Sequence, residues 1–256
     1  MLALVSPAKK LDFSDVASDL PHSQPTFLKK SAELVKAARA LSRAELQRLM
    51  KLSDKLTDLN FARFKAFSTP FTKANARQAV LIFNGDTYIG LDAKTLSADD
   101  LAFAQDHLRI LSGLYGALRP LDLIQPYRLE MGRRLNNPRG ADLYDFWGDD
   151  LADALDDTVA GDTEPVVINL ASNEYFKAAA PKHMKSRVIT PVFKEVKNGE
   201  AKVLGMFAKR ARGMMARYMI VNRLERSEDL KKFSDGGYAW QDHLSNDDTW
   251  VYTRQR

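Results

Sequence analysis

Three residues of the chain could carry acid–base or anion chemistry, because each follows closely on a segment with strand character. They are Lys9, Asp86 and Glu174. The carboxyl ends of strands are where α/β proteins bind their ligands. If the fold brings the three side chains into one cleft, Lys9 would bind an anion or a leaving group, and Asp86 or Glu174 would serve as the acid or base. The substrate of such an enzyme would be a small anion or a nucleotide-like molecule.

A second interpretation of these residues needs no chemistry. Lysines beside a strand end are commonly solvated at the surface, and Asn84-Gly85-Asp86 is a composition typical of turns. The sequence contains no P-loop, no nucleophile elbow and no GxGxxG fingerprint, so no known catalytic motif selects a reaction. Both interpretations stay open at this point, and whether the protein is an enzyme is left undecided.

The stretch from Leu108 to Gly132 combines glycines, prolines and arginines with apolar residues. Ser97 and Asp100 form a capping box that starts a helix, and Gly113 is placed to end it. The turn from Gly113 to Gly116 resembles the hairpin of helix-hairpin-helix DNA-binding modules, in which backbone N–H groups approach a phosphate. The arginines that would add positive charge there are Arg109, Arg119 and Arg128. A glycine-capped helix followed by a purely structural turn is the alternative.

The densest group of cations lies in residues 208–224, AKRARGMMARYMIVNRL. The interleaved methionines and tyrosine predict a helix that is partly buried and partly turned towards anions. At helical spacing the cations fall into two pairs on neighbouring sides of the helix, Arg210 with Arg217 and Lys209 with Arg212. Phosphate contacts from these residues would supply affinity for DNA with little reading of base sequence. A charged surface helix without a ligand is the alternative.

Composition narrows the classes of function. The chain has 256 residues, a net charge of +5 and a pI of about 9.2, which permits a polyanionic partner without requiring one. Cysteine is absent, which excludes disulfides, thiol peroxidase chemistry and thiolate metal sites. The four histidines lack metal-ligand spacing, so we predict no metal and no cofactor, and an iron-binding protein that uses carboxylates stays as a third option. No apolar run suits a membrane span or a signal peptide. We therefore expect a cytoplasmic location, no membrane partner and no evident protein partner.

Helix and strand signals alternate from end to end, which favours one compact α/β domain. Apolar runs predict buried strands at residues 2–5, 79–83 and 166–170. Residues 87–91 continue with β character. Ser42 and Glu45 form a capping box inside a helical region, and residues 143–155 predict an amphipathic helix that Gly148 interrupts.

Turn residues near the end of the chain predict two hairpins. Asn198-Gly199 is a strong hairpin signal, with residues 202–207 as its second strand. Residues 238–240 and 250–254 could pair as a closing hairpin. Pro191 favours an edge position for the strand that contains it, because proline cannot donate to the ladder.

Taken together, these segments resemble the bacterial peroxide-stress family YaaA. The resemblance is carried by blocks in family order that cover nearly the whole chain: SPAKKLDF at Ser6, FNGDTYIGL at Phe83, HLRILSGLYGALRPLDLIQPYRLEMG at His107, LYDFWGD at Leu143, VINLASNEYFK at Val167 and AKRARGMMARY at Ala208. It implies an α/β fold with a mixed β core surrounded by helices, a basic cleft and a helix-hairpin-helix element, all in a single domain of residues 1–256.

The resemblance also implies a function. Members are cytoplasmic DNA-binding factors that protect bacteria from hydrogen peroxide, and they are linked to lowering the unincorporated iron that drives hydroxyl-radical damage. The expected partner is double-stranded or distorted DNA, recognised by shape more than by base sequence. The expected DNA contacts are Arg109, Gly113, Gly116, Arg119, Arg128, Lys209, Arg210, Arg212 and Arg217. An enzyme that uses Lys9, Asp86 and Glu174 stays the alternative.

Overall fold

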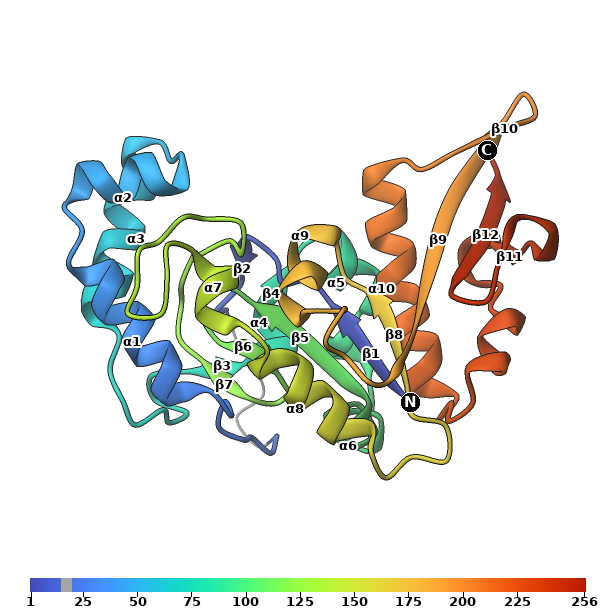
Figure 1. Ribbon diagram of the computed structural model, residues 1–256, viewed down its shortest axis with the longest axis horizontal. Coiled ribbons are helices and arrows are strands. Elements are labelled where there is room, and N and C mark those ends of the chain that lie inside the picture. Colours follow the sequence, from blue (N-terminus) through green and yellow to red (C-terminus); the bar gives the residue numbers. More distant parts are fainter. Residues whose placement is uncertain (15–19) are drawn as a thin grey trace.

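The computed structural model describes residues 1–14 and 20–256, and its centre is a mixed β-sheet (Figure 1). The strands of this sheet are β1 (Leu2–Val5), β5 (Leu108–Ser112), β6 (Gly116–Leu118), β8 (Val166–Leu170), β9 (Arg187–Lys197), β10 (Glu200–Lys202), β11 (Ala239–Trp240) and β12 (Thr249–Gln255). Their order is β11-β12-β9-β8-β1-β5-β6, and β10 pairs with β9. The central strands from β12 to β5 run parallel, whereas β6, β10 and β11 pair antiparallel with their neighbours.

The two central strands confirm the predictions from apolar runs. β1 and β8 occupy residues 2–5 and 166–170, and every residue in them is buried. Helices cover both faces of a parallel sheet, so its central strands are apolar on both sides rather than alternating. β1 pairs with β5 on one side and β8 on the other, which places the ends of β1 and β8 beside each other.

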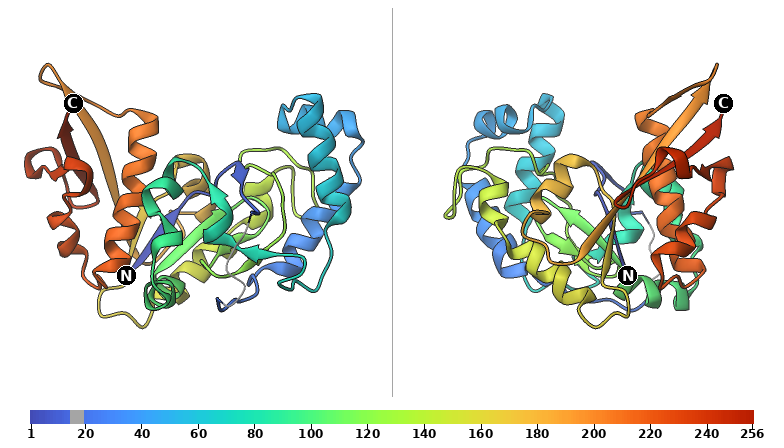
Figure 2. Two further views of the ribbon diagram at one scale, coloured as in Figure 1. Left: turned by 180° about the vertical axis from the view of Figure 1, so that it is seen from behind. Right: turned by 45° about the vertical axis from the view of Figure 1, so that its right-hand side comes forward.

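Helices surround the sheet, and the mixed α/β fold class is confirmed (Figures 1 and 2). They are α1 (Leu28–Arg39), α2 (Arg43–Met50), α3 (Asp54–Ala66), α4 (Ala79–Ile82), α5 (Asp86–Leu91), α6 (Ala98–His107), α7 (Leu143–Trp147), α8 (Asp150–Val159), α9 (Asn173–Phe176) and α10 (Gly205–Val221). α6 and α10 pack on one face of the sheet, and α8 packs on the other. Shorter strands pair outside the main sheet, β2 (Lys10–Leu11) with β4 (Phe83–Asn84) and β3 (Arg77–Gln78) with β7 (Leu123–Ile124).

The capping signals in the sequence are confirmed. Ser42 caps α2 and Ser97 caps α6, each with the reciprocal bond from the residue three positions on. α7 and α8 are separated at Gly148, as the glycine in that segment predicts. The hairpin at Asn198-Gly199 joins β9 to β10, although its second strand is residues 200–202 rather than 202–207.

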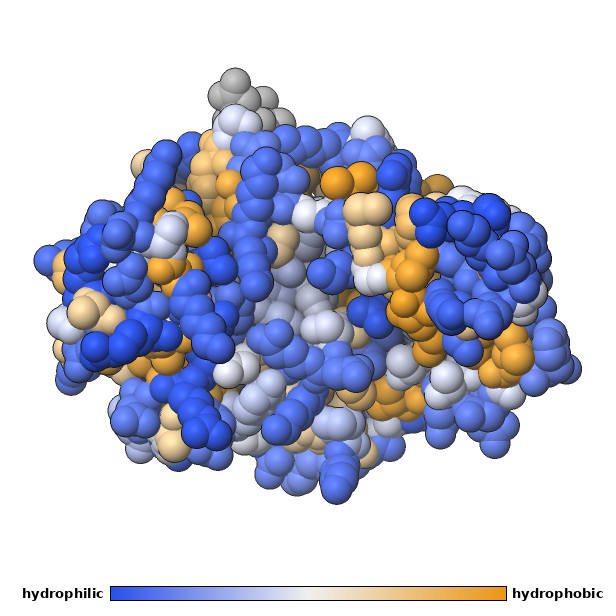
Figure 3. All heavy atoms as spheres, turned by 90° about the horizontal axis from the view of Figure 1, so that it is seen from above, coloured by the Kyte–Doolittle hydropathy of each residue, from blue (hydrophilic) through white to orange (hydrophobic). Residues whose placement is uncertain are grey.

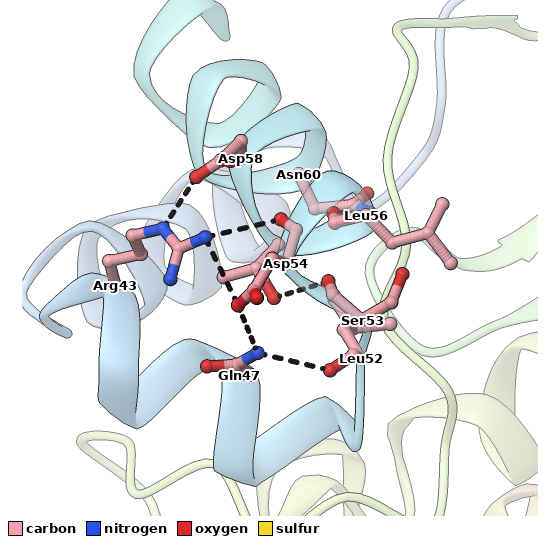
Figure 4. A network of polar contacts seen from close by, with 9 residues as sticks. Arg43, Gln47, Leu52, Ser53, Asp54, Leu56, Asp58 and Asn60 are labelled. Carbon is pink, nitrogen blue, oxygen red and sulfur yellow. Dashed lines mark hydrogen bonds and ion pairs between the residues drawn. The ribbon is translucent and has the colours of Figure 1, made fainter.

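α1, α2 and α3 form a helical lobe beside the sheet (Figures 1 and 2). A polar network joins α2 to the start of α3 (Figure 4). The Arg43 guanidinium donates to the carboxylates of Asp58 and Asp54, and the Gln47 amide donates to Asp54 Oδ1 at 2.8 Å. These groups are solvent-exposed, so the network adds little free energy of folding. Arg43 is thus a surface cation that already has carboxylate partners, and it can serve as a control for cations that have none.

Two expected strands are helices instead. Residues 79–82 form α4 and residues 86–91 form α5, so the prediction of strand over 79–83 holds only at Phe83, in β4, and the prediction of β character over 87–91 is wrong. A short apolar run has no periodicity that separates a buried strand from a buried helical turn. Tertiary contacts decide here: Ala79 N–H donates to Asp122 O and Val80 N–H donates to Pro120 O.

The glycine turn also differs from expectation. α6 ends at His107, and residues 108–112 form β5, which pairs with β1 and continues through a turn into β6. Gly113 and Gly116 therefore sit at the turn of a β-hairpin, and the helix-hairpin-helix interpretation of this segment is wrong. Leu108, Ile110 and Leu111 fit an apolar helix face as well as a buried strand, and pairing with β1 selects the strand.

The C-terminal part completes the sheet. β11 and β12 pair antiparallel, which confirms the closing hairpin. β9 lies between β8 and β12, so the edge position expected from Pro191 is wrong. Pro191 is tolerated because the pairing of β9 with β8 ends at Ile189, before the proline. Within the part of the chain that the structure describes, no helix is both long and apolar enough to cross a bilayer.

Candidate functional site: a mixed-charge cavity

A cavity of about 500 Å³ lies where β1 and β8 end. The segments after these strands, residues 6–10 and 170–175, supply much of its wall. Ser6 ties the two strand ends together, because its Oγ accepts from Ser172 N–H at 2.9 Å. This is the position where open parallel sheets bind ligands, and the volume is in the usual range of ligand pockets, about 300 to 1,000 Å³.

The three residues singled out for acid–base chemistry all line this cavity. Lys9 is 65% exposed at the mouth, with its Nζ 3.3 Å from Glu130 Oε1. Glu174 Oε1 accepts from Gly132 N–H at 3.0 Å, which ties α9 to the segment that follows Glu130. Asp86 opens α5, and its carboxylate has no ion pair or side-chain hydrogen bond among the residues described. The structure therefore brings Lys9, Asp86 and Glu174 together around one space.

Two glycines that sequence reasoning missed set the distance between α5 and α10. A Cβ on Gly213 would collide with the carbonyl oxygen of Thr87, and one on Gly90 would collide with that of Arg210. The two helices thus cross with backbone against backbone. This close crossing places the first turn of α5, with Asp86, and the first half of α10 on one cavity. Glycine inside a helix costs about 1 kcal/mol relative to alanine, which could have marked both positions as packing sites.

α10 divides its cations between two hollows, as their spacing predicts. Lys209 and Arg212 line the cavity. Arg210 and Arg217 line a separate hollow beside Met214 and Arg254. Arg217 donates to the carbonyls of Leu91 and Asp92. Among the described residues Lys209 and Arg212 have neither a carboxylate nor any other side-chain hydrogen-bond partner, so the cavity receives the unpaired cations of the helix.

Glu130 is the principal site residue that sequence reasoning missed. Its side chain is 6% exposed, and its Oε1 lies near the Lys9 ammonium and accepts from Arg128 at 3.2 Å and Arg133 at 3.1 Å. Burial pushes the pKa of Glu130 up, but hydrogen bonds from Arg133 and Arg128 outweigh burial and hold the pKa below its ordinary value. The residue is therefore a carboxylate at neutral pH. One acidic residue flanked by arginines in YRLEMGRR was the available signal.

Three residues that line the cavity each have a side-chain polar atom that is buried without a partner in the described structure: Oε2 of Glu130, Nε of Arg128 and Nε of Arg212. Buried polar atoms in folded proteins nearly always have a partner, so each unpaired atom calls for an explanation. Burial also lowers the pKa of Arg212. The set contains one acceptor and two donors.

Tyrosine rings line another part of the wall. Tyr88, Tyr127 and Tyr175 are buried, and burial raises the pKa of each phenol. The rings are consequently neutral. Tyr88 donates to Ser6 O at 3.1 Å, which links α5 to the end of β1. The wall therefore combines flat aromatic surface with charged groups.

The residues of the glycine turn lie elsewhere, and the fold uses them for packing. Gly113 and Gly116 are buried, and Trp147 lies beside them. The Trp147 Nε1–H donates to Gly113 O at 3.2 Å. A Cβ on Gly116 would lie 2.9 Å from the Trp147 ring. Neither glycine lines the cavity. Their backbone is not presented to an external phosphate.

Two of the arginines expected at this turn are already engaged. Arg109 donates to the carbonyls of Gln105 and Leu108, and burial lowers its pKa to about 10. Arg119 pairs with the fully buried Asp122 at 3.2 Å. Arg128, the third, is 17% exposed and forms part of the cavity wall.

The face around the strand ends is mostly hydrophilic and is hollowed near its centre (Figure 3). The N-terminal half of α10, the loop after β1 and α9 reach this face from different sides (Figure 1). Over residues 1–14 and 20–256, no group of three or more His, Cys, Asp or Glu side chains is placed to hold a metal ion.

The chain is similar to known proteins along its full length. The family described as "Peroxide stress protein YaaA" matches residues 1–244. The chain is 53% identical to a UPF0246 protein of Ralstonia nicotianae and 53% identical to one of Dechloromonas aromatica. It is 52% identical to a UPF0246 protein of Colwellia psychrerythraea. Each match covers 100% of this chain and 99% of the relative.

Proposed function

Because the chain belongs to the YaaA family of peroxide stress proteins, we propose that it protects DNA under peroxide stress by binding it across the mouth of the cavity. Cations from two distant segments support the proposal. Lys9 and Lys10 follow β1, whereas Lys209 and Arg212 lie on α10, and all four line one cavity. Contacts of this kind go to phosphates, so the binding would carry little base specificity.

The observation that carries the proposal is the absence of acidic partners. Among the residues that the structure describes, Lys10, Lys209 and Arg212 form no ion pair. A cation without a protein acceptor keeps its full attraction for a phosphate and releases a counterion when it binds. Arg109, Arg119 and the two turn glycines are not part of the proposed interface, because the fold engages or buries them.

Titration of a labelled duplex at several salt concentrations tests the proposal. We expect the double variant Lys209→Ala plus Arg212→Ala to lower the slope of log affinity against log salt by about 1.8, or about 0.9 for each phosphate that it no longer neutralises. The matched control is Arg43→Ala plus Lys202→Ala, which removes two cations that are already paired with carboxylates. Equal slopes for parent and cavity variant would remove α10 from the interface.

Iron limitation forms a separate part of the proposal. The family resemblance implies that the protein lowers the concentration of unincorporated iron. DNA binding would then place the protein where hydroxyl radicals do most harm. Equilibrium dialysis against ferrous iron under argon tests whether the protein takes up iron itself. Stoichiometric uptake would support direct binding, whereas no uptake above a control protein would contradict it.

The second candidate function is an enzyme acting on a small anionic or nucleotide-like substrate. It is favoured by the placement of Lys9, Asp86 and Glu174 around one cavity. Lys9 would bind the anionic group, and a carboxylate would transfer the proton. Incubation with supercoiled plasmid and with deoxynucleoside monophosphates, followed by gel analysis and mass spectrometry, tests this function. A product that disappears in Asp86→Asn supports it, and the absence of any product contradicts it.

A further inference from the structure

The cavity wall is chemically mixed, and this restricts the kind of ligand that suits it. Arg128 Nε and Arg212 Nε are buried donors without partners, and Glu130 Oε2 is a buried acceptor without one. The phosphodiester group of DNA offers acceptors only, so it would leave Glu130 Oε2 unpaired and would bring a second negative charge beside it. A nucleobase edge presents N–H donors beside carbonyl or ring-nitrogen acceptors, which matches both kinds of atom.

Aromatic surface favours the same class of ligand. Tyr88, Tyr127 and Tyr175 line the cavity as neutral rings, and planar bases stack on such rings whatever their sequence. The volume of about 500 Å³ suits one nucleotide and excludes a duplex. Enzymes and binding proteins that take a single base from DNA hold it in pockets of this composition, between aromatic side chains and hydrogen-bonding groups.

The positive charge at the mouth of the cavity suits the DNA strand from which such a nucleotide would come. Lys9 is exposed at the rim while its ammonium lies near Glu130 in the wall, so one residue links mouth and interior. Lys10 and Lys209 also line the cavity and have no acidic partner among the residues described. Phosphates on either side of an extruded nucleotide would lie against cations of this kind.

We propose that one nucleotide of bound DNA leaves the base stack and enters this cavity, where Glu130 Oε2 accepts from an N–H of the base and Arg128 and Arg212 donate to it. In this form the inference deepens the proposed DNA binding and rests on it. Glu130 is thereby a binding residue of the cavity, in addition to its role in holding three cations.

A duplex that carries 2-aminopurine opposite an abasic site tests the proposal, because fluorescence of this base is quenched in the stack and rises on extrusion. Duplex affinity is measured in the same titration by anisotropy of a distant label. We expect a several-fold rise in fluorescence with the parent protein. Glu130→Gln, which turns the free acceptor into an amide, should remove most of this rise when the duplex is saturated with protein.

A second variant guards against loss of folding in Glu130→Gln. Thr87→Phe narrows the cavity from α5 without removing a charge, and it should also suppress the fluorescence rise on a duplex saturated with protein. The matched control is Thr158→Phe on α8, which lies outside the cavity lining. A fluorescence rise that survives in Thr87→Phe would overturn the proposal, as would a parent protein that saturates the duplex without any rise.

Calorimetric titration with dAMP and with inorganic phosphate answers two separate questions. One is whether the cavity recognises a nucleotide, and the other is whether that nucleotide comes from DNA. Binding of dAMP that Glu130→Gln abolishes, without extrusion from DNA, would support the nucleotide chemistry of the cavity and contradict a DNA source. Binding of phosphate with equal affinity to dAMP would contradict recognition of the base. Duplex binding with neither extrusion nor dAMP binding would overturn this inference and leave the proposed function standing. Binding of dAMP without duplex binding would overturn the proposed function and the DNA source of the nucleotide, and would leave only recognition of a nucleotide by the cavity.

Discussion

The arginines around the β5–β6 hairpin and the cations around the cavity differ in whether the fold gives them an acceptor. Arg109 donates to two backbone carbonyls and Arg119 pairs with buried Asp122. Lys209 and Arg212 have no acidic partner in the described part of the chain. A guanidinium that has exchanged water for a protein acceptor has little attraction left for a phosphate. We therefore base the proposed ligand site on unpaired charge rather than on the density of positive residues.

The largest effect on this comparison comes from removing the acceptor in the hairpin region. Asp122 is fully buried and accepts from Ser23 Oγ at 2.6 Å and from Arg119 N–H at 2.8 Å. We expect Asp122→Ala to lower the free energy of unfolding by about 3 to 5 kcal/mol, because Ser23 Oγ, the Arg119 N–H and the half-buried Arg119 guanidinium all lose their acceptor, at about 1 to 3 kcal/mol for each donor that stays buried. Urea denaturation measures the loss, and Asp122→Asn, which keeps an acceptor, should lose less. An Asp122→Ala protein as stable as the parent would show that Arg119 is not held by this carboxylate.

The crossing of α5 and α10 gives the next largest effect. We expect Gly213→Ala to cost about 1 to 3 kcal/mol, because the added methyl group forces the two helices apart. Gly205→Ala is the control on the same helix, since a Cβ there meets nothing within 4 Å. Thermal unfolding of both variants measures the difference, and duplex affinity should fall only in Gly213→Ala. Equal melting temperatures would contradict backbone contact as the device that positions the cavity wall.

Removing a single cation from each region tests the comparison directly. We expect Lys209→Ala to weaken duplex binding several-fold and to reduce the salt slope by about 0.9. Arg119→Ala should leave the slope unchanged for the fraction of protein that is folded, because Asp122 already neutralises that guanidinium. Anisotropy titrations at matched concentrations of folded protein measure both. A lower slope for Arg119→Ala would return the hairpin region to the DNA interface.

The smallest effect is the pH dependence contributed by Glu130. Its pKa in the folded protein lies below the ordinary value of 4.5, so the folded state favours its charged form. A carboxyl group of this kind contributes stability above its unfolded pKa, and the contribution is lost as the pH falls below 4.5 through the folded pKa. We therefore expect the difference in unfolding free energy between parent and Glu130→Gln to shrink on acidification through this window. A difference independent of pH there would show that Glu130 is not held as an ion.

Sequence reasoning succeeded where the signal was local. β1 and β8 were predicted residue for residue, because runs such as LALV and VVINL suit strands buried on both faces. The capping boxes of α2 and α6 and the two cationic faces of α10 were also correct, since each depends on residues a few positions apart. Lys9, Asp86 and Glu174 were proposed together because each follows a strand-like segment, although only Phe83–Asn84 of the segment before Asp86 form a strand and residues 79–82 are helical.

Local patterns were thus enough for the central strands, the helix ends and the family. Long-range contacts were needed to make residues 108–112 a strand and residues 79–82 a helix, because the apolar residues of both runs fit either form and their distant partners select it. Tertiary structure also placed Glu130 among three cations and left Lys209 and Arg212 unpaired. The reason is physical: whether a charge is free depends on acceptors that the chain brings from far away, and a linear pattern carries no record of those distances.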